Sequence, residues 1–269
     1  MKTRYPIVLV HGLGMKDTFF MKSWGRIDRI LRIQGYTVYK SDVDGFGTVA
    51  GNAVQLKTEI EEILKETGAE KVNIIAHSKG GLEARMAASS LGMGPAIASI
   101  TTIGTPHRGS KTVDRLLKAP DSLFNVASFA VNNWIGLIGD TKPDFYAVCR
   151  DFSTDYARRF NEENPDVPGV FYQSYAGVMK TPLSDINLST ANLVVRLIEG
   201  ENDGLVTLES ARWGKRFTLL TGCGNRGVSH YDEIDFRRAS FPIRAGQSDF
   251  PDICAVYRQI VNDLAARGF

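Results

Sequence analysis

One stretch decides the fold of this chain: residues 72–82, which run Val-Asn-Ile-Ile-Ala-His-Ser-Lys-Gly-Gly-Leu. The first five residues are apolar apart from Asn73, as in a buried strand, and a helical pattern begins after the serine. Residues 76–80, Ala-His-Ser-Lys-Gly, match the pattern G-x-S-x-G with Ala in the first glycine position. A turn this sharp between strand and helix leaves no space for bulky side chains two residues from the serine. The pattern predicts that Ser78 is a nucleophile, held in a strained conformation at a helix N-terminus.

Strand and helix patterns alternate along the rest of the chain. Six short apolar runs are typical of buried parallel strands: Pro6–Val10, Tyr36–Val43, Lys71–Ala76, Ile97–Ile103, Gly169–Tyr175 and Asn192–Ile198. Amphipathic helices are predicted around residues 24–31, 53–64 and 253–264. This order predicts an α/β fold with a six-stranded, mostly parallel sheet flanked by helices. No repeat, low-complexity tract or linker interrupts the chain, so residues 1–269 are expected to form a single domain.

Composition excludes several classes of protein. The chain has 269 residues and a net charge of +2, whereas a nucleic-acid-binding protein needs a basic surplus. Three cysteines, Cys149, Cys223 and Cys254, are too few for a disulfide framework or a zinc site, although one pair could form. No run is long and apolar enough to span a membrane. The first predicted strand starts within six residues of Met1, which leaves no space for a signal peptide in this chain, so secreted and cytoplasmic locations both stay open.

A nucleophilic serine needs a base and an orienting carboxylate. Of the four histidines, His77 is adjacent to the serine and His107 follows a strand, where a structural role is expected. His230 lies in a loop before the last helix, which suits the chain order serine, acid, histidine. The acid is expected between them, at the end of the run Asn192–Ile198. Asp203 is the first choice because a glycine follows it, and Glu201 is the alternative.

Attack on an ester produces an oxyanion that backbone N–H groups stabilise. The residue after the nucleophile, Lys79, supplies one such group, and Leu13 in the loop His11-Gly-Leu-Gly14 is expected to supply the other. The Lys79 side chain itself is expected to be solvated.

Residues 119–139 depart from the alternating pattern. They contain a single charged residue, Asp121, among many apolar and several Asn, Pro and Gly residues. Two interpretations are open: a buried helical insert, or a mobile cap whose apolar face covers a hydrophobic site.

These motifs together resemble those of the bacterial triacylglycerol lipases of the Pseudomonas, Burkholderia and Proteus type. The matching segments are residues 10–14, 76–80, 104–109, 202–206 and 230–233, which follow one another from the first strand to the last loop. The resemblance implies an α/β-hydrolase fold, a helical lid insert at about residues 110–150, and hydrolysis of long-chain acylglycerols at an oil–water interface without an organic cofactor. The cysteines do not match the usual disulfide of that family.

The resemblance also implies a structural calcium ion that ties the histidine loop to a segment before the catalytic acid. The matching residues are Asp232 and, with a less regular spacing, Asp185. Carboxylates suit Ca²⁺, which prefers oxygen ligands. The alternative is that both are ordinary loop acids, with Asp232 paired to an arginine such as Arg237.

The sequence leaves alternatives for the function. A phospholipase, an acyltransferase or an esterase for short-chain esters would use the same three residues. A hydrolase fold that has lost its activity and serves as a binding module is a further alternative, which the complete ordered set of Ser78, Asp203 and His230 argues against. The sequence does not define acyl length or oligomeric state.

Overall fold

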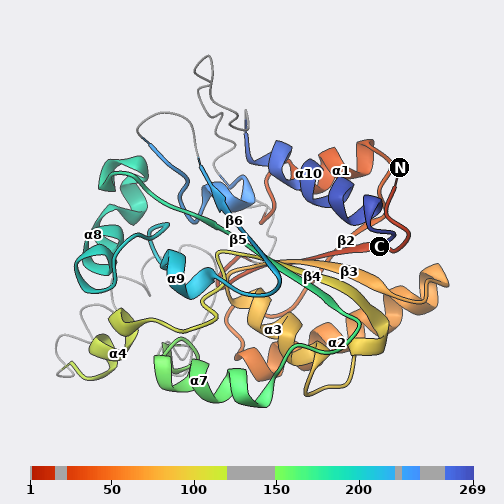
Figure 1. The fold of residues 1–269 in the computed structure, drawn as a ribbon, viewed down its shortest axis with the longest axis horizontal. Helices are drawn as coiled ribbons and strands as arrows, with labels where there is room; N and C mark the ends of the chain where they lie inside the picture. The colour runs from red at the N-terminus through yellow and green to blue at the C-terminus, as the bar shows by residue number, and fades with distance from the viewer. Residues whose placement is uncertain (1, 16–22, 120–148, 222–225, 237–251) are drawn as a thin grey trace.

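A computed structural model describes residues 2–15, 23–119, 149–221, 226–236 and 252–269. Its centre is a six-stranded parallel sheet with the order β2-β1-β3-β4-β5-β6 (Figure 1). The strands are β1 (Ile7–Val10), β2 (Val38–Lys40), β3 (Val72–His77), β4 (Ile97–Ile103), β5 (Phe171–Gly177) and β6 (Arg216–Leu220). The predicted α/β class and six-stranded sheet are confirmed.

Five of the six predicted strands correspond to β1–β5, but the sixth prediction is wrong. Asn192–Ile198 lies in helix α8 (Ser189–Ile198), and the sixth strand is β6. The apolar run of α8 has a helical period, because Asn192 and Val195 are buried whereas Leu197 is exposed. Strand β6 is at the edge of the sheet and mostly half-buried, so its sequence lacks a continuous apolar pattern.

Helices cover both faces of the sheet, because alternate residues of each strand point to opposite sides. In β1, Ile7 and Leu9 pack in one core cluster with helices α1 (Ile27–Ile33) and α10 (Ile253–Ala266). Val8 and Val10 pack in another cluster with α2 (Val49–Thr67) and α3 (Lys79–Ala88). Figure 1 shows these two pairs of helices on opposite sides of the sheet.

The remaining helices gather at the side of the sheet away from the two chain ends (Figure 1). They are α4 (Lys111–Leu117), α7 (Thr154–Glu163), α8 and α9 (Leu208–Ala211). The short 3-10 helices η2 (Pro182–Ser184) and η3 (Ile186–Leu188) pack against α8, and η4 (Asp232–Ile234) packs against α10. A further 3-10 turn, η1 (Gly94–Ala96), precedes β4.

Several predictions concern residues that the structure does not describe. Apart from residues 110–119, which include α4, and residues 149–150, the expected lid insert lies outside the described residues. Cys223 lies outside them too, while Cys149 and Cys254 are buried free thiols. Of the helices in the described part of the chain, none has both the length and the hydropathy to cross a bilayer.

The turn from β3 into α3 depends on Gly80. A Cβ atom at this position would lie 2.6 Å from the carbonyl oxygen of His11 and 2.8 Å from that of Val10. Both atoms belong to backbone, which cannot move aside as a side chain can. The absence of a side chain at Gly80 therefore lets α3 start directly against the end of β1.

We expect Gly80→Ala to destabilise the protein by about 1–3 kcal/mol, because one added methyl group overpacks a site walled by backbone. Chemical denaturation measures this, with Gly51→Ala as control, since a Cβ at Gly51 would meet only the Thr48 side chain, at 3.3 Å. Equal denaturation midpoints for the two variants would contradict the packing argument.

Candidate active site

Ser78 lies between β3 and α3 in a backbone conformation that non-glycine residues rarely adopt. Its φ is 53° and its ψ is −126°, and it is one of two non-glycine residues with positive φ in the described part of the chain. The Ser78 N–H donates to the Ile103 carbonyl at 2.9 Å, and its own carbonyl accepts from Thr105 Oγ1 at 2.8 Å. Both contacts come from the end of β4 and the loop after it, and they hold the strained turn in place.

The loop of residues 11–14 packs directly against Ser78. A Cβ on Gly12 would lie 2.7 Å from the Ser78 Cβ, so only glycine allows this approach. Leu13 follows Gly12, and Lys79 follows Ser78 as the first residue of α3. The first N–H groups of a helix have no partner within it, which leaves the Lys79 amide available for a ligand. The structure thus places both predicted oxyanion donors on segments that flank the serine.

Contrary to the prediction, the Lys79 side chain is not exposed to solvent. It is fully buried, with Nζ 3.0 Å from Glu83 Oε1 and donating to the Gly47 carbonyl. Asn52 also donates to Glu83, at 2.8 Å. The pKa of Glu83 is raised, mainly because the carboxyl group is buried. The i,i+4 spacing of Lys79 and Glu83 is typical of a helical ion pair, but its burial could not be predicted from local sequence, because it depends on a loop more than thirty residues away.

His230 and Asp203 form a buried pair. His230 Nδ1 lies 2.7 Å from Asp203 Oδ2, and the backbone N–H of His230 donates to the Asp203 carbonyl at 2.8 Å. The other carboxylate oxygen, Oδ1, accepts from the N–H groups of Leu205 and Val206 at 2.9 and 2.8 Å. Glu201, the alternative acid, is exposed. Between the two candidates, the structure brings Asp203 to the histidine, although on a loop after helix α8 rather than after a strand.

The histidine loop and the serine turn meet at the carboxyl edge of β3 and β4. The rings of His77 and His230 are 4.4 Å apart between centroids. Gly104 directly follows the Ile103 carbonyl that binds Ser78, and a Cβ on Gly104 would lie 3.1 Å from His230 Nδ1. The three predicted triad residues therefore belong to one contiguous buried group.

Glu233 also belongs to this group, although its role was not predicted from the sequence. Its Oε2 lies 3.3 Å from His77 Nε2 and 3.5 Å from His230 Nδ1, and its Oε1 accepts from the Gly177 N–H at 2.7 Å. Burial, and then the charge of Asp203, raise the pKa of Glu233 well above its ordinary value, which favours the neutral acid. The sequence feature that could have identified Glu233 is its spacing three residues after His230, within one helical turn.

His77 is buried beside Glu233. Burial, and then the charge of His230, lower its pKa well below the ordinary value, so its ring stays neutral. Ligand atoms of His77, His230 and Glu233 lie within 4.8 Å of one another, a spacing that could accommodate a metal ion. In this group, however, His230 Nδ1 is already bonded to Asp203.

His107 occupies a structural position, as the sequence suggested. Its ring is buried, with Nε2 2.9 Å from Thr102 Oγ1 and Nδ1 3.3 Å from the Arg85 guanidinium, and it stacks on Trp213. Burial and then the charge of Arg85 lower its pKa well below the ordinary value.

The two residues expected to bind calcium, Asp185 and Asp232, are brought together on either side of Ser229. Asp232 is bound by the guanidinium of Arg226, with Nη1 2.9 Å from its Oδ2. Arg237, the partner suggested for Asp232 by the sequence, lies outside the described residues. The site predicted to bind calcium therefore already contains a cationic side chain, that of Arg226.

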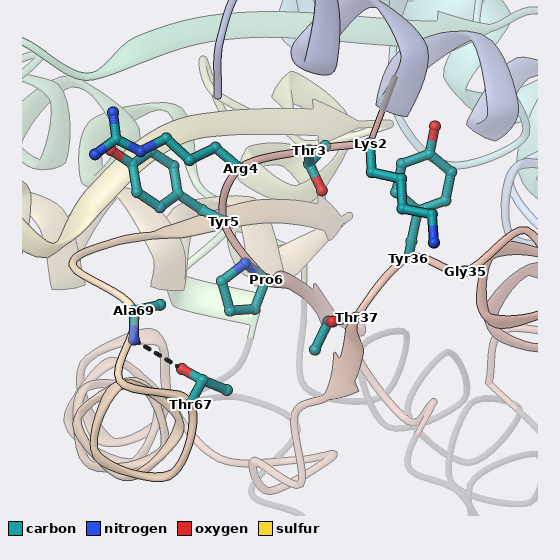
Figure 2. A pocket seen from close by; sticks show the side chains of 10 residues that line it. All are labelled: Lys2, Thr3, Arg4, Tyr5, Pro6, Gly35, Tyr36, Thr37, Thr67 and Ala69. Atoms are coloured by element: carbon teal, nitrogen blue, oxygen red, sulfur yellow. Dashed lines mark hydrogen bonds between the residues drawn. The ribbon is translucent and has the colours of Figure 1, made fainter.

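A separate hollow of about 240 Å³ lies beside the amino ends of β1 and β2 (Figure 2). It is lined by Lys2, Thr3, Arg4, Tyr5, Pro6, Gly35, Tyr36, Thr37, Thr67 and Ala69. Most of these residues precede β1 or β2, whereas Ser78 follows the carboxyl end of β3. This hollow is therefore not the site of the serine.

Comparison with known proteins gives consistent results. The family profile described as alpha/beta hydrolase fold matches residues 5–170. A triacylglycerol lipase of Vibrio cholerae is 31% identical over 87% of this chain and 80% of its own length. Triacylglycerol lipase 2 of Saccharomyces cerevisiae is 30% identical over 91% of this chain and 74% of its own. A triacylglycerol lipase of Burkholderia plantarii is 28% identical over 99% and 87%.

Solved structures agree on the fold. A mature Bacillus licheniformis lipase superposes with a TM-score of 0.65 at 21% identity, covering 87% of each chain. A metagenomic carboxyl esterase superposes with a TM-score of 0.72 at 16% identity, covering 99% of this chain and 77% of its own. The chain therefore belongs to the alpha/beta hydrolase family, and its curated relatives include triacylglycerol lipases of bacteria and yeast.

Proposed function

We propose that this protein is a triacylglycerol lipase, which hydrolyses carboxylic esters of lipids through an acyl-enzyme intermediate. One observation carries the catalytic part of the proposal: a strained serine at a helix N-terminus stands in the same buried group as a hydrogen-bonded histidine–aspartate pair. The named relatives support the lipid substrate.

In this proposal Ser78 Oγ attacks the ester carbonyl carbon while His230 Nε2 takes the hydroxyl proton. Asp203 holds Nδ1 on the other side of the ring, which fixes the tautomer and stabilises the imidazolium. The oxyanion accepts hydrogen bonds from the Leu13 and Lys79 amides. The tetrahedral intermediate expels the alcohol, which takes the proton from His230. Water then attacks the acyl-enzyme by the same route, so side chains and water suffice and no organic cofactor is needed.

Exposed apolar side chains support contact with a lipid surface. Leu183, Ile186 and Leu197 are 81%, 77% and 85% exposed, and they belong to η2, η3 and α8, which pack against one another. Figure 1 shows α8 on the side of the molecule away from the chain ends. Apolar side chains gathered in this way favour an oil–water interface over bulk water. We therefore propose that the substrate is an ester held at such an interface.

Replacing Ser78 by Ala is the direct test of the function. We expect Ser78→Ala to fold as the parent does and to lose hydrolysis of emulsified triacylglycerol and of a chain-length series of nitrophenyl esters, because the Ser78 hydroxyl forms the acyl-enzyme. Circular dichroism and titration of released fatty acid measure the two properties. Substantial activity in the variant would show that another residue carries the reaction, and a parent inactive on every ester would refute the function.

The choice of acid predicts a difference between two variants. Asp203→Asn should lower kcat strongly, by up to about 10⁴-fold, because the amide no longer fixes the working tautomer of the histidine. Glu201→Gln, the matched control two residues away with an exposed side chain, should leave kcat within about twofold, since exposed charges contribute little. Similar losses in both variants would contradict the assignment of Asp203.

A further inference from the structure

Two buried carboxylates share one serine beside the histidine loop. Ser229 Oγ donates to Asp185 Oδ2 at 2.8 Å, and the Ser229 N–H donates to Asp232 Oδ2 at 3.0 Å. Asp185 and Asp232 are both almost completely buried. Two carboxylates removed from water in this way need a cation or several hydrogen-bond donors nearby.

Arg226 supplies that cation. Its Nη1 and Nη2 lie 2.9 and 3.0 Å from the two oxygens of Asp232, a bidentate arrangement. Its Nε donates to the Ser184 carbonyl at 2.8 Å. One guanidinium therefore joins the segment of Asp185 to the loop of His230, two residues from the histidine.

The backbone fixes the position of Arg226. Its carbonyl accepts from the Lys180 N–H at 3.1 Å and from the Ser184 hydroxyl. The next residues continue this contact, because Gly227 forms a β-bridge with Met179 and the Val228 N–H donates to the Val178 carbonyl at 2.9 Å. The guanidinium is thus presented from an anchored segment.

The oxygens that a calcium ion would need already accept hydrogen bonds. Asp232 is bound by Arg226 and Ser229, and Asp185 accepts from Ser229 and from the Asn187 N–H at 3.1 Å. Ca²⁺ requires six to eight oxygen ligands at about 2.3–2.6 Å, so it would have to displace the guanidinium. The residues present do not fit the ion that the family resemblance implies.

We propose that Arg226 takes the place of calcium in this chain: its guanidinium bridges Ser184 and Asp232 and positions the His230 loop. Arg226 is a positioning residue, and it acts on the reaction only through His230. The catalytic consequence rests on the proposed function, whereas the absence of a calcium requirement does not.

The test compares the parent with Arg226→Ala and Arg226→Lys. For the parent, we expect no calcium binding in a calorimetric titration, and no change of melting temperature or activity with the chelator EGTA.

Arg226→Ala should lose about tenfold in kcat with little change in KM, because loop position rather than substrate binding is affected. With the guanidinium gone, the two carboxylates should bind Ca²⁺, which raises the melting temperature and restores kcat. Arg226→Lys, which keeps the charge but not the bidentate contact, should lie between the two.

Arg216→Ala is the matched control, since it removes another arginine–aspartate contact, Arg216 with Asp263 at 2.7 Å, which lies at the amino end of β6. It should leave kcat and the response to calcium as in the parent. Loss of stability or activity of the parent on chelation would overturn the proposal, as would an Arg226→Ala variant equal to the parent. Calcium binding and melting temperature are independent of ester hydrolysis, so their result stands even if the proposed function fails.

Discussion

The arrangement of the site depends on one constraint, the close approach of backbone to backbone at the turn between β3 and α3. Ser78 adopts a positive φ, and the strain is held by hydrogen bonds from the end of β4 and the following loop. The turn also needs Gly80 to lie within van der Waals contact of the end of β1. Because the three strands β1, β3 and β4 are adjacent in the sheet, backbone at the ends of β1 and β4 packs against the turn that follows β3. A central position in a rigid sheet thus maintains a conformation that an isolated peptide would not keep.

The second part of the site is the loop of His230, where burial affects the charge of the acidic side chains. Asp203 and Glu233 both face His230 Nδ1, and two carboxylates ionised at that distance would repel each other. The raised pKa of Glu233 favours the neutral acid there, and its other oxygen is held by the Gly177 amide. Two residues after the histidine, Asp232 is bound by Arg226. Three buried acids therefore fix the loop: Asp203 binds His230, Glu233 accepts from the Gly177 amide, and Asp232 binds Arg226.

Much of this arrangement could be predicted from local sequence. Buried strands have short apolar runs, and the elbow has small residues at fixed positions, so five strands and the turn at Ser78 were predictable. The apolar run Asn192–Ile198 was misassigned because β-branched residues suggest a strand, whereas its burial follows a helical period. Asp203 and His230 followed from chain order. Lys79 and Glu83 have the i,i+4 spacing of a helical pair, but their burial beneath the Gly47 loop and the contact of Arg226 with Ser184 join segments that meet only in the folded chain, so no local pattern predicts them.

Covalent labelling tests whether Ser78 is the nucleophile activated by His230. The protein is treated with a serine-reactive alkyl phosphonate, and the modified peptide is identified by mass spectrometry. We expect one adduct per chain, on Ser78, formed in step with the loss of ester hydrolysis and greatly slowed in a His230→Ala variant. An adduct on another residue, or full ester hydrolysis by protein labelled at Ser78, would show that Ser78 is not the nucleophile.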